Sequence, residues 1–198
     1  MGISPGDFER LQQRVASRGK SLGAKEPLAP LTFRRVLGID PSLRGSGFGV
    51  IEVQAGRPRC VASGTIRCSR EWARSRCLGQ IAATVRDILR QHTPGVCAVE
   101  GLFFAQNLRT AITMGEARGA ALAMVAEAGL PIYELAPRQV KQAIVGFGGA
   151  QKFAVAKMVQ RMLDLPETPD ADAADALALA LAFAQANGRP IRSRLKEV

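Results

Sequence analysis

Four carboxylates stand where acidic side chains could bind metal ions. Asp40 follows the apolar run Val36–Ile39, and Glu100 ends the apolar segment "GVCAVE". Asp172 and Asp175 are three residues apart in an Ala- and Leu-rich segment, so a helix there would place both on one face. A carboxylate at the end of a buried strand costs desolvation free energy unless something offsets it. We interpret the four as one candidate cluster of acidic ligands.

Convergence of the four carboxylates depends on a sheet. If the strands that end in Asp40 and Glu100 are parallel neighbours, both side chains emerge at the same sheet edge. The clustered charges would repel and raise each other's pKa, and divalent cations would remove that repulsion. The chain has a single histidine, His92, so a metal site must use carboxylates, which favours Mg²⁺ or Mn²⁺. Two such ions could activate water against a phosphodiester.

Other interpretations exist for single acidic residues. Asp40 alone could form the turn before Pro41. Asp170 is expected to support the N-terminus of the last helix through the helix macrodipole. The remaining acids considered, which are expected to lie at the surface, are Glu116, Glu127 and Glu134.

Composition indicates the partner and the compartment. The chain has 198 residues, enough for one domain with a sizeable core, and a net charge of +10. Such an excess predicts a polyanionic partner, with nucleic acid first. No apolar stretch is long enough to span a bilayer. The four cysteines form no C-x-x-C pair, which argues against structural zinc and favours reduced thiols in a cytoplasmic protein.

The order of apolar segments predicts an α/β fold with a mixed sheet and helices on both faces. Strands are expected at residues 36–40, 48–53, 60–66, 95–101 and 131–135. Helices are expected at residues 71–91, 108–128, 137–145 and 151–163, and from Thr168 onward. In the last helix Thr168 is the predicted N-cap and Pro169 the first helical residue.

Five motifs occur together in a fixed order: "LGIDPSLRGSGFGVIE", "AVEGLFFAQN", "MGEARGAA", "APRQVKQAIVGFGGAQK" and "DADAADALALA". With them, residues 36 to about 187 resemble the bacterial RuvC family of Holliday-junction resolvases. The resemblance implies an RNase H-like fold with a mixed five-stranded sheet flanked by helices. It implies a homodimer that resolves four-way DNA junctions by paired nicks in recombination and repair. It also implies two Mg²⁺ per subunit, replaceable by Mn²⁺, and the RuvA–RuvB branch-migration complex as a partner.

The resemblance assigns roles to the acidic residues. It implies that Asp40, Glu100, Asp172 and Asp175 are the catalytic metal ligands, in agreement with the cluster expected from their positions. The polar, basic and proline-containing composition of residues 1–34 predicts a flexible N-terminal extension, for which the family has no counterpart. We expect a nuclease domain at residues 35–188 and a basic C-terminal tail at residues 189–198.

Further residues are expected to contact DNA. The resemblance places Phe103 where an aromatic ring stacks on an unpaired base at the junction centre. The alternative is a loop ring tucked into the core, for which Phe104 is the better candidate. Lys141 and Lys152 match basic positions near the scissile phosphate, although either could be a solvated helix charge.

Some positions depart from the family pattern or invite a second interpretation. Gln106 stands where the family has a basic residue, and Ser42 replaces the first glycine of the turn after Asp40. Gly115 and Gly119 are four residues apart inside a helix, where glycine costs about 1 kcal/mol relative to alanine. Close packing against the sheet is the expected reason, and a dimer contact is the alternative.

Two other functions share individual features of this sequence. An actin-like or sugar-kinase-like phosphotransferase also opens with a G-x-D strand and a glycine-containing hairpin, but it requires a second phosphate loop and a longer chain. A non-catalytic junction-binding protein is disfavoured because all four acidic positions are filled.

Overall fold

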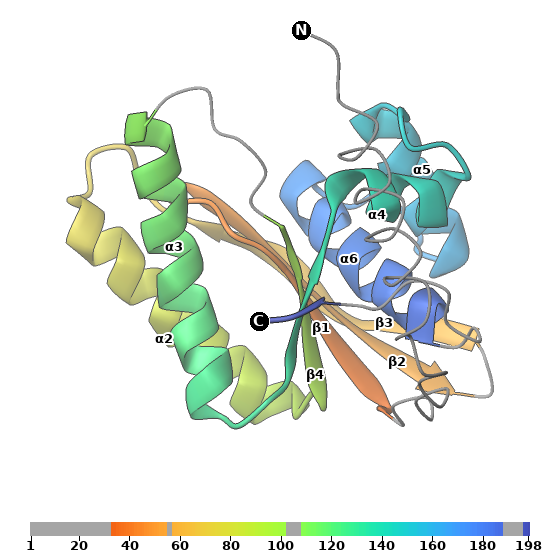
Figure 1. The fold of residues 1–198 in the computed structure, drawn as a ribbon, viewed down its shortest axis with the longest axis horizontal. Helices are drawn as coiled ribbons and strands as arrows, with labels where there is room; N and C mark the ends of the chain where they lie inside the picture. The colour runs from red at the N-terminus through yellow and green to blue at the C-terminus, as the bar shows by residue number, and fades with distance from the viewer. Residues whose placement is uncertain (1–32, 55–56, 102–107, 188–195) are drawn as a thin grey trace, which may run out of the picture. The chain divides into compact units, whose positions relative to one another are not determined.

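The computed structural model describes residues 33–54, 57–101, 108–187 and 196–198, which form a sheet with helices on both faces (Figure 1). The strands are β1 (Arg35–Asp40), β2 (Gly45–Gln54), β3 (Arg57–Arg67), β4 (Val96–Glu100), β5 (Ile132–Leu135) and β6 (Lys196–Glu197). The helices are α2 (Arg74–His92), α3 (Leu108–Glu127), α4 (Pro137–Val145), α5 (Lys152–Met162) and α6 (Ala171–Asn187). The predicted α/β class is confirmed.

The sheet has the strand order β3-β2-β1-β4-β5-β6. The first three strands are antiparallel neighbours, whereas β4 and β5 run parallel to β1. The five expected strands are present, and β6 adds a sixth, antiparallel to β5. This strand lies in the segment 189–198 that was expected to be a tail. With two residues it carries no periodic signal that a sequence could show.

Two apolar layers cover the sheet, and neighbouring residues of β1 face opposite layers. Val36 packs in the layer with α4, α5 and α6, whereas Leu37 packs in the layer with α2 and α3. Figure 1 shows the two groups of helices on either side of the sheet. Because both faces are covered, β1 and β4 are continuously apolar rather than alternating.

Helix α6 lies directly on the backbone of β1 and β2. A Cβ atom at Gly38 would lie 2.0 Å from the Ala176 carbonyl oxygen, and one at Gly47 would lie 1.9 Å from the Asp172 carbonyl oxygen. Only glycine permits so close an approach of helix to strand. Gly47 is also the register partner of Asp40. This contact therefore sets the first turn of α6 beside the end of β1.

The start of α6 differs from the prediction. The helix begins at Ala171, and its first hydrogen bond runs from the Ala174 amide to the Asp170 carbonyl at 2.8 Å. The Thr168 hydroxyl instead donates to Gln160 Oε1 and accepts from Lys157 Nζ, both at 2.7 Å. The predicted N-cap at Thr168 is wrong because two side chains of α5 occupy its hydroxyl.

The prediction that Gly115 and Gly119 pack against the sheet is also wrong. Among the described residues, no atom lies within 4 Å of a Cβ built at either position. Both glycines lie on a side of α3 that faces away from the sheet. Within residues 33–54, 57–101, 108–187 and 196–198, no helix is long and apolar enough to cross a membrane.

Candidate active site

The ends of β1 and β4 bring two carboxylates to one edge of the sheet. The strands are parallel, with Ile39 opposite Val99, so Asp40 and Glu100 are the next residues at the same end. Asp172 and Asp175 lie in the first turns of α6, which is anchored over this edge through Gly47. The strand arrangement predicted from the sequence is confirmed, whereas the roles of the four residues stay predictions.

Asp40 is the carboxylate with the most perturbed environment. Burial raises its pKa from 3.8 to about 7, and the negative charges of Glu100, Asp175 and Asp172 add to the rise, while Lys152 opposes it. Such a shift means that the neighbouring charges are close enough to act on Asp40. The carboxylates thus form an electrostatic cluster, as their positions in the sequence predicted.

Glu100 lies in a similar environment. Its pKa is raised, first by burial and then by the charge of Asp175, against the lowering effects of Lys152, Lys141 and Arg118. The charge of Lys141, on α4, therefore acts on Glu100. Among the described residues, the basic side chains near the two strand ends lower the pKa values of Asp40 and Glu100 by less than burial and the neighbouring carboxylates raise them.

Lys152 makes a direct contact with the cluster. Its Nζ atom donates to Asp175 Oδ2 at 2.7 Å. This hydrogen bond, together with the nearby carboxylates, raises the pKa of Lys152 despite partial burial. The lysine lies at the first position of α5, where it is largely exposed and could exchange one anionic partner for another.

The donor chemistry of the cluster suits hard divalent cations, since every candidate ligand is a carboxylate oxygen. In the described part of the chain, however, no three His, Cys, Asp or Glu side chains are arranged to hold an ion as they lie. Asp175 is turned towards Lys152, and the Asp172 carboxylate lies over Gly45. Ion binding therefore requires these side chains to rotate.

Several predicted residues lie apart from the cluster. Phe103, Phe104 and Gln106 lie outside the described residues. Asp170 forms an ion pair with Arg67 of β3, at the exposed edge beside α6, rather than joining the other carboxylates. The interpretation of Asp170 as a residue of the helix terminus agrees with its position directly before Ala171.

Sequence reasoning missed the link between Arg118 and Glu134. Arg118 is nearly buried; it donates to the Glu100 carbonyl oxygen and, at 3.1 Å, to Glu134 Oε1. Glu134, which was expected to be an ordinary surface acid, is largely buried and also binds Lys196 at 3.0 Å. The arginine inside the motif "MGEARGAA" was the available signal, because an unpaired arginine is not tolerated on the inner side of a helix.

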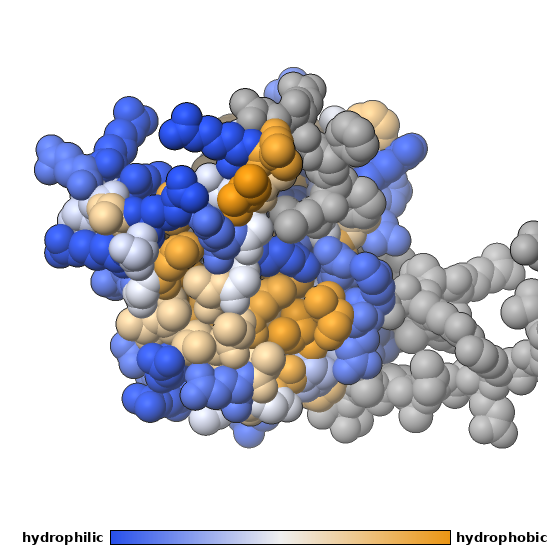
Figure 2. Space-filling model, turned by 60° about the vertical axis from the view of Figure 1, so that its left-hand side comes forward, coloured by the Kyte–Doolittle hydropathy of each residue, from blue (hydrophilic) through white to orange (hydrophobic). Residues whose placement is uncertain are grey.

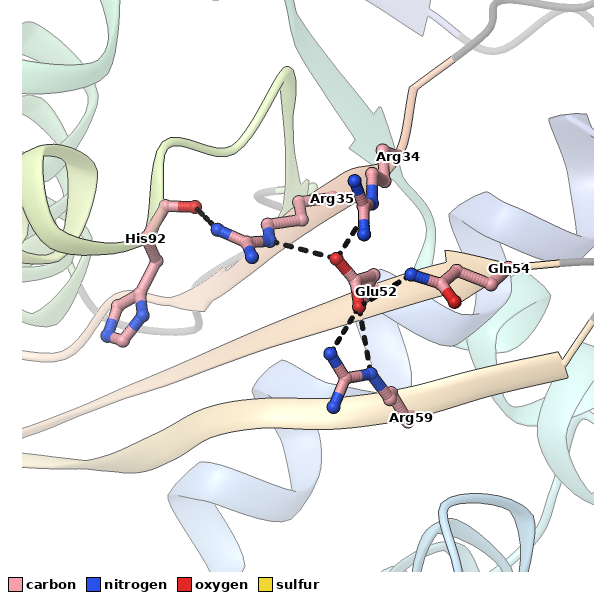
Figure 3. Close-up of polar contacts among 6 residues, drawn as sticks. All are labelled: Arg34, Arg35, Glu52, Gln54, Arg59 and His92. Carbon is pink, nitrogen blue, oxygen red and sulfur yellow. Dashed lines mark hydrogen bonds and ion pairs between the residues drawn. The ribbon is translucent and has the colours of Figure 1, made fainter.

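A second cluster, of one carboxylate and three arginines, lies at the opposite end of β1 and β2 (Figure 3). The Glu52 carboxylate is fully covered by its neighbours and pairs with Arg34 at 2.9 Å, Arg35 at 3.3 Å and Arg59 at 2.8 Å. Arg35 also donates to the His92 carbonyl at 2.8 Å, which ties the end of α2 to this cluster. Hydrogen bonding from Arg59, aided by the other arginines, lowers the pKa of Glu52 despite the opposing effect of desolvation.

Comparison with protein families gives one match over most of the domain. The model described as "Crossover junction endodeoxyribonuclease RuvC" matches residues 36–183. A protein of that name from Vibrio parahaemolyticus is 47% identical over 152 residues, which cover 77% of this chain and 87% of that protein. Another from Roseiflexus sp. is 40% identical over 168 residues, covering 84% of this chain and 99% of that protein.

Solved structures also show similarity to Holliday junction resolvases. Thermus thermophilus RuvC in complex with a Holliday junction substrate has a TM-score of 0.75 and 36% identity, covering 83% of this chain and 99% of that one. The yeast mitochondrial Holliday junction resolvase Ydc2 has a TM-score of 0.57 at 12% identity, covering 90% and 86% of the two chains. At that identity, Ydc2 shows a shared fold only.

Proposed function

Because the chain belongs to the RuvC family of crossover junction endodeoxyribonucleases, we propose that it resolves Holliday junctions by paired, symmetric, Mg²⁺-dependent nicks in DNA recombination and repair. The observation that carries this proposal is the cluster at the ends of β1 and β4, where burial and three neighbouring carboxylates raise the pKa of Asp40 to about 7. Carboxylates that repel one another at a sheet edge are suited to binding cations rather than to stabilising the fold.

Asp40, Glu100, Asp172 and Asp175 would hold two Mg²⁺ per subunit, and Mn²⁺ could replace them. Mg²⁺ held there would offset the repulsion among the carboxylates and would supply Lewis-acid activation of water and of the scissile phosphodiester. The carboxylates orient that water by accepting its hydrogen bonds. Asp175 becomes available as a ligand once Lys152 releases it.

The lysines at the site would then bind the DNA backbone. Lys152 lies within 2.7 Å of one carboxylate, so on release its ammonium group is placed to bind a phosphate oxygen beside the cluster. Lys141, whose charge acts on Glu100, would contribute a second positive charge. We further propose that Phe103 stacks on an unpaired base at the junction centre, a contact worth roughly 1–3 kcal/mol.

We propose that α3 supplies the homodimer contact. Leu108 and Ile112 are exposed, and Gly115 and Gly119 continue the same helical face with no described atom within 4 Å of an added Cβ. Figure 2 shows an apolar area on this side of the molecule. Since no described atom fills the space beside these glycines, a second helix could approach this face of α3 closely. A dimer is also what symmetric nicking of a four-way junction requires.

The expected partners and location follow from the same proposal. The RuvA–RuvB branch-migration complex would deliver junctions to the dimer, and the protein would act in the cytoplasm. The four cysteines are free thiols in the structure, which is compatible with a reducing compartment.

The experiment that tests the function is incubation of the purified protein with a synthetic four-way junction, with Mg²⁺ or with EDTA. Paired nicks with Mg²⁺ and none with EDTA are expected. Asp40→Asn is expected to abolish nicking and to leave junction binding intact, because affinity comes mainly from phosphate contacts. Asp170→Asn is the matched control: it removes a carboxylate two residues before Asp172, and wild-type cleavage is expected.

The main alternative is a protein that binds junctions without cutting them. Junction binding that persists with no Mg²⁺-dependent product would establish that alternative. Ca²⁺ sharpens the distinction, since its looser coordination is expected to support binding without turnover.

A further inference from the structure

Arg118 of α3 connects the end of β4 to β5, outside the carboxylate cluster itself. Its guanidinium group donates to the backbone carbonyl of Glu100 and, at 3.1 Å, to the carboxylate of Glu134. Its side chain is only 10% exposed. A buried guanidinium group requires both a counter-charge and hydrogen-bond acceptors. Glu134 supplies the first, and the two oxygens together supply the second.

The Glu100 carbonyl lies where the sheet can no longer supply a donor from β1. The parallel pairing of β1 and β4 runs as far as Ile39 and Val99. Beyond Asp40 the chain continues into Pro41, which has no N–H group. An unpaired carbonyl at a partly buried strand end is costly. Arg118 therefore takes the place of the missing strand donor.

Glu134, the carboxylate partner of Arg118, also contacts the C-terminal strand β6. Lys196 of β6 binds the second carboxylate oxygen of Glu134 at 3.0 Å, and the two residues are register partners. Glu134 is thus held between one cation from α3 and one from β6. Side chains of α3, β5 and β6 form a continuous chain of contacts that ends on the backbone of Glu100.

We infer that Arg118 is a positioning residue of the nuclease site: it fixes the backbone of Glu100, and Glu134 and Lys196 hold Arg118 in place. The inference rests on the proposed function, in which Glu100 is a metal ligand. Without this anchor, the last residue of β4 is free to shift, and its carboxylate moves relative to Asp40 and Asp175. Displacement of a reacting group by about 1 Å is enough to cost roughly 100-fold in rate.

The test compares Arg118→Gln, Arg118→Lys, Glu134→Gln and Lys196→Ala with the wild-type protein. Arg74→Gln is the matched control, because it removes another arginine–glutamate pair that involves α3, between Arg74 of α2 and Glu116 of α3 at 3.0 Å, and that pair does not include Glu100. Three quantities are measured: the single-turnover cleavage rate at saturating enzyme, junction affinity in EDTA, and Mn²⁺ affinity without DNA by calorimetry.

Arg118→Gln is expected to lower the cleavage rate and the Mn²⁺ affinity by about 10–100-fold, the usual effect of losing a residue that orients a ligand. Junction affinity in EDTA is expected to stay within about twofold, since phosphate contacts set it. Arg118→Lys keeps the charge but can reach one acceptor at a time, so partial recovery is expected. Glu134→Gln is expected to have a smaller effect, and Lys196→Ala the smallest.

Wild-type cleavage and Mn²⁺ affinity in Arg118→Gln would overturn the inference, and so would an equal loss in Arg74→Gln. If Arg118→Gln does not fold, Arg118→Lys and Glu134→Gln decide the question: unchanged Mn²⁺ affinity in both rejects a positioning role. The Mn²⁺ measurement needs no DNA. Failure of the wild-type protein to cut junctions would therefore reject the proposed function separately.

Discussion

The two ends of the β1–β2 hairpin carry carboxylates, one partly and one fully buried, in opposite surroundings. At one end, Asp40 faces other carboxylates, and its pKa is raised to about 7. At the other end, Glu52 is enclosed by three arginines, and its pKa is lowered. The strands are the same, so the difference lies in which side chains were placed around each acid.

This difference separates a carboxylate that stabilises the fold from one that is available to a ligand. Glu52 is fully paired and holds together the ends of β1, β2 and β3, with α2 attached through Arg35. Among the described residues, no basic side chain forms an ion pair with Asp40. Lys152, whose charge acts on Asp40, pairs with Asp175 instead. An acid that is buried without a partner weakens the folded state unless a ligand compensates for it.

The largest expected effect comes from breaking the contact that builds the Asp40 end. In Gly47→Ala, the new methyl group would overlap the backbone of Asp172. We expect a loss of stability of about 1–3 kcal/mol or more, as for other overpacked sites, together with loss of cleavage because α6 is displaced. Thermal melts and junction cleavage measure both effects.

The control for this variant is Gly79→Ala, in α2, where no described atom lies within 4 Å of the added methyl group. It is expected to raise stability by roughly 0.5–1 kcal/mol, because alanine favours the helix. Unchanged stability and cleavage in Gly47→Ala would show that the contact with α6 is not essential to the site.

The next largest effect is expected from neutralising one acid at each end of the hairpin. Glu52→Gln is expected to lower the melting temperature, since the three arginines lose their shared counter-charge. Asp40→Asn is expected to raise the melting temperature of the metal-free protein at pH 8, since it removes a charge that burial and its neighbours disfavour. Melts of the two variants under the same conditions decide the comparison. Shifts of the same sign would contradict it.

The pH dependence of stability extends the same comparison. The folded state raises the pKa of Asp40 from 3.8 to about 7, so between these values it binds more protons than the unfolded chain. The unfolding free energy of the metal-free protein is therefore expected to rise as the pH falls from 8 towards 5. Glu52 has a lowered pKa, so its contribution is present above pH 4.5 and lost as the pH falls further.

Denaturant titrations of the metal-free protein from pH 3 to pH 8 measure this curve. Asp40→Asn is expected to flatten its upper part, with a residual slope from Glu100, and Glu52→Gln is expected to flatten its lower part. Saturating Mg²⁺ is expected to remove the upper slope in the wild-type protein. An upper slope that is the same in Asp40→Asn would assign it to other groups.

The smallest expected effect concerns single arginines around Glu52. The side chain of Arg34 is 70% exposed, so Arg34→Ala is expected to change stability by no more than about 1 kcal/mol, as for other exposed ion pairs. Arg35 is less exposed and also binds the His92 carbonyl, so Arg35→Ala is expected to cost more. Chemical denaturation of the two variants gives the order, and the reverse order would reject this account of the cluster.

The elements that carry the site were predictable from the sequence, whereas the contacts that support it were not. The segments that end in Asp40 and Glu100 are continuously apolar, and this pattern predicted two buried strands. The convergence of the carboxylates then followed from a parallel sheet. The predicted start of α6, Pro169, was wrong by two residues, because Thr168 is engaged by α5 and local capping preferences contain no information about that contact.

Residues paired across the fold were the main omission. Glu134 reads as a surface acid, because its partners Arg118 and Lys196 are distant in the sequence. Glu52 passed unnoticed for the same reason. Gly115 and Gly119 were predicted to face the sheet, but helical spacing alone gives a shared face and not its direction.

The placement of Asp172 and Asp175 in α6 has a consequence for when activity can arise during synthesis. The ribosome produces Asp40 and Glu100 well before the helix that completes the cluster. At roughly 5–20 residues per second, the chain between Glu100 and Asp175 takes several seconds to make. A nascent chain that has folded strands β1 to β5 still lacks half of the carboxylates. The proposed nuclease is therefore switched on late in translation, after the strands that α6 must cover have emerged.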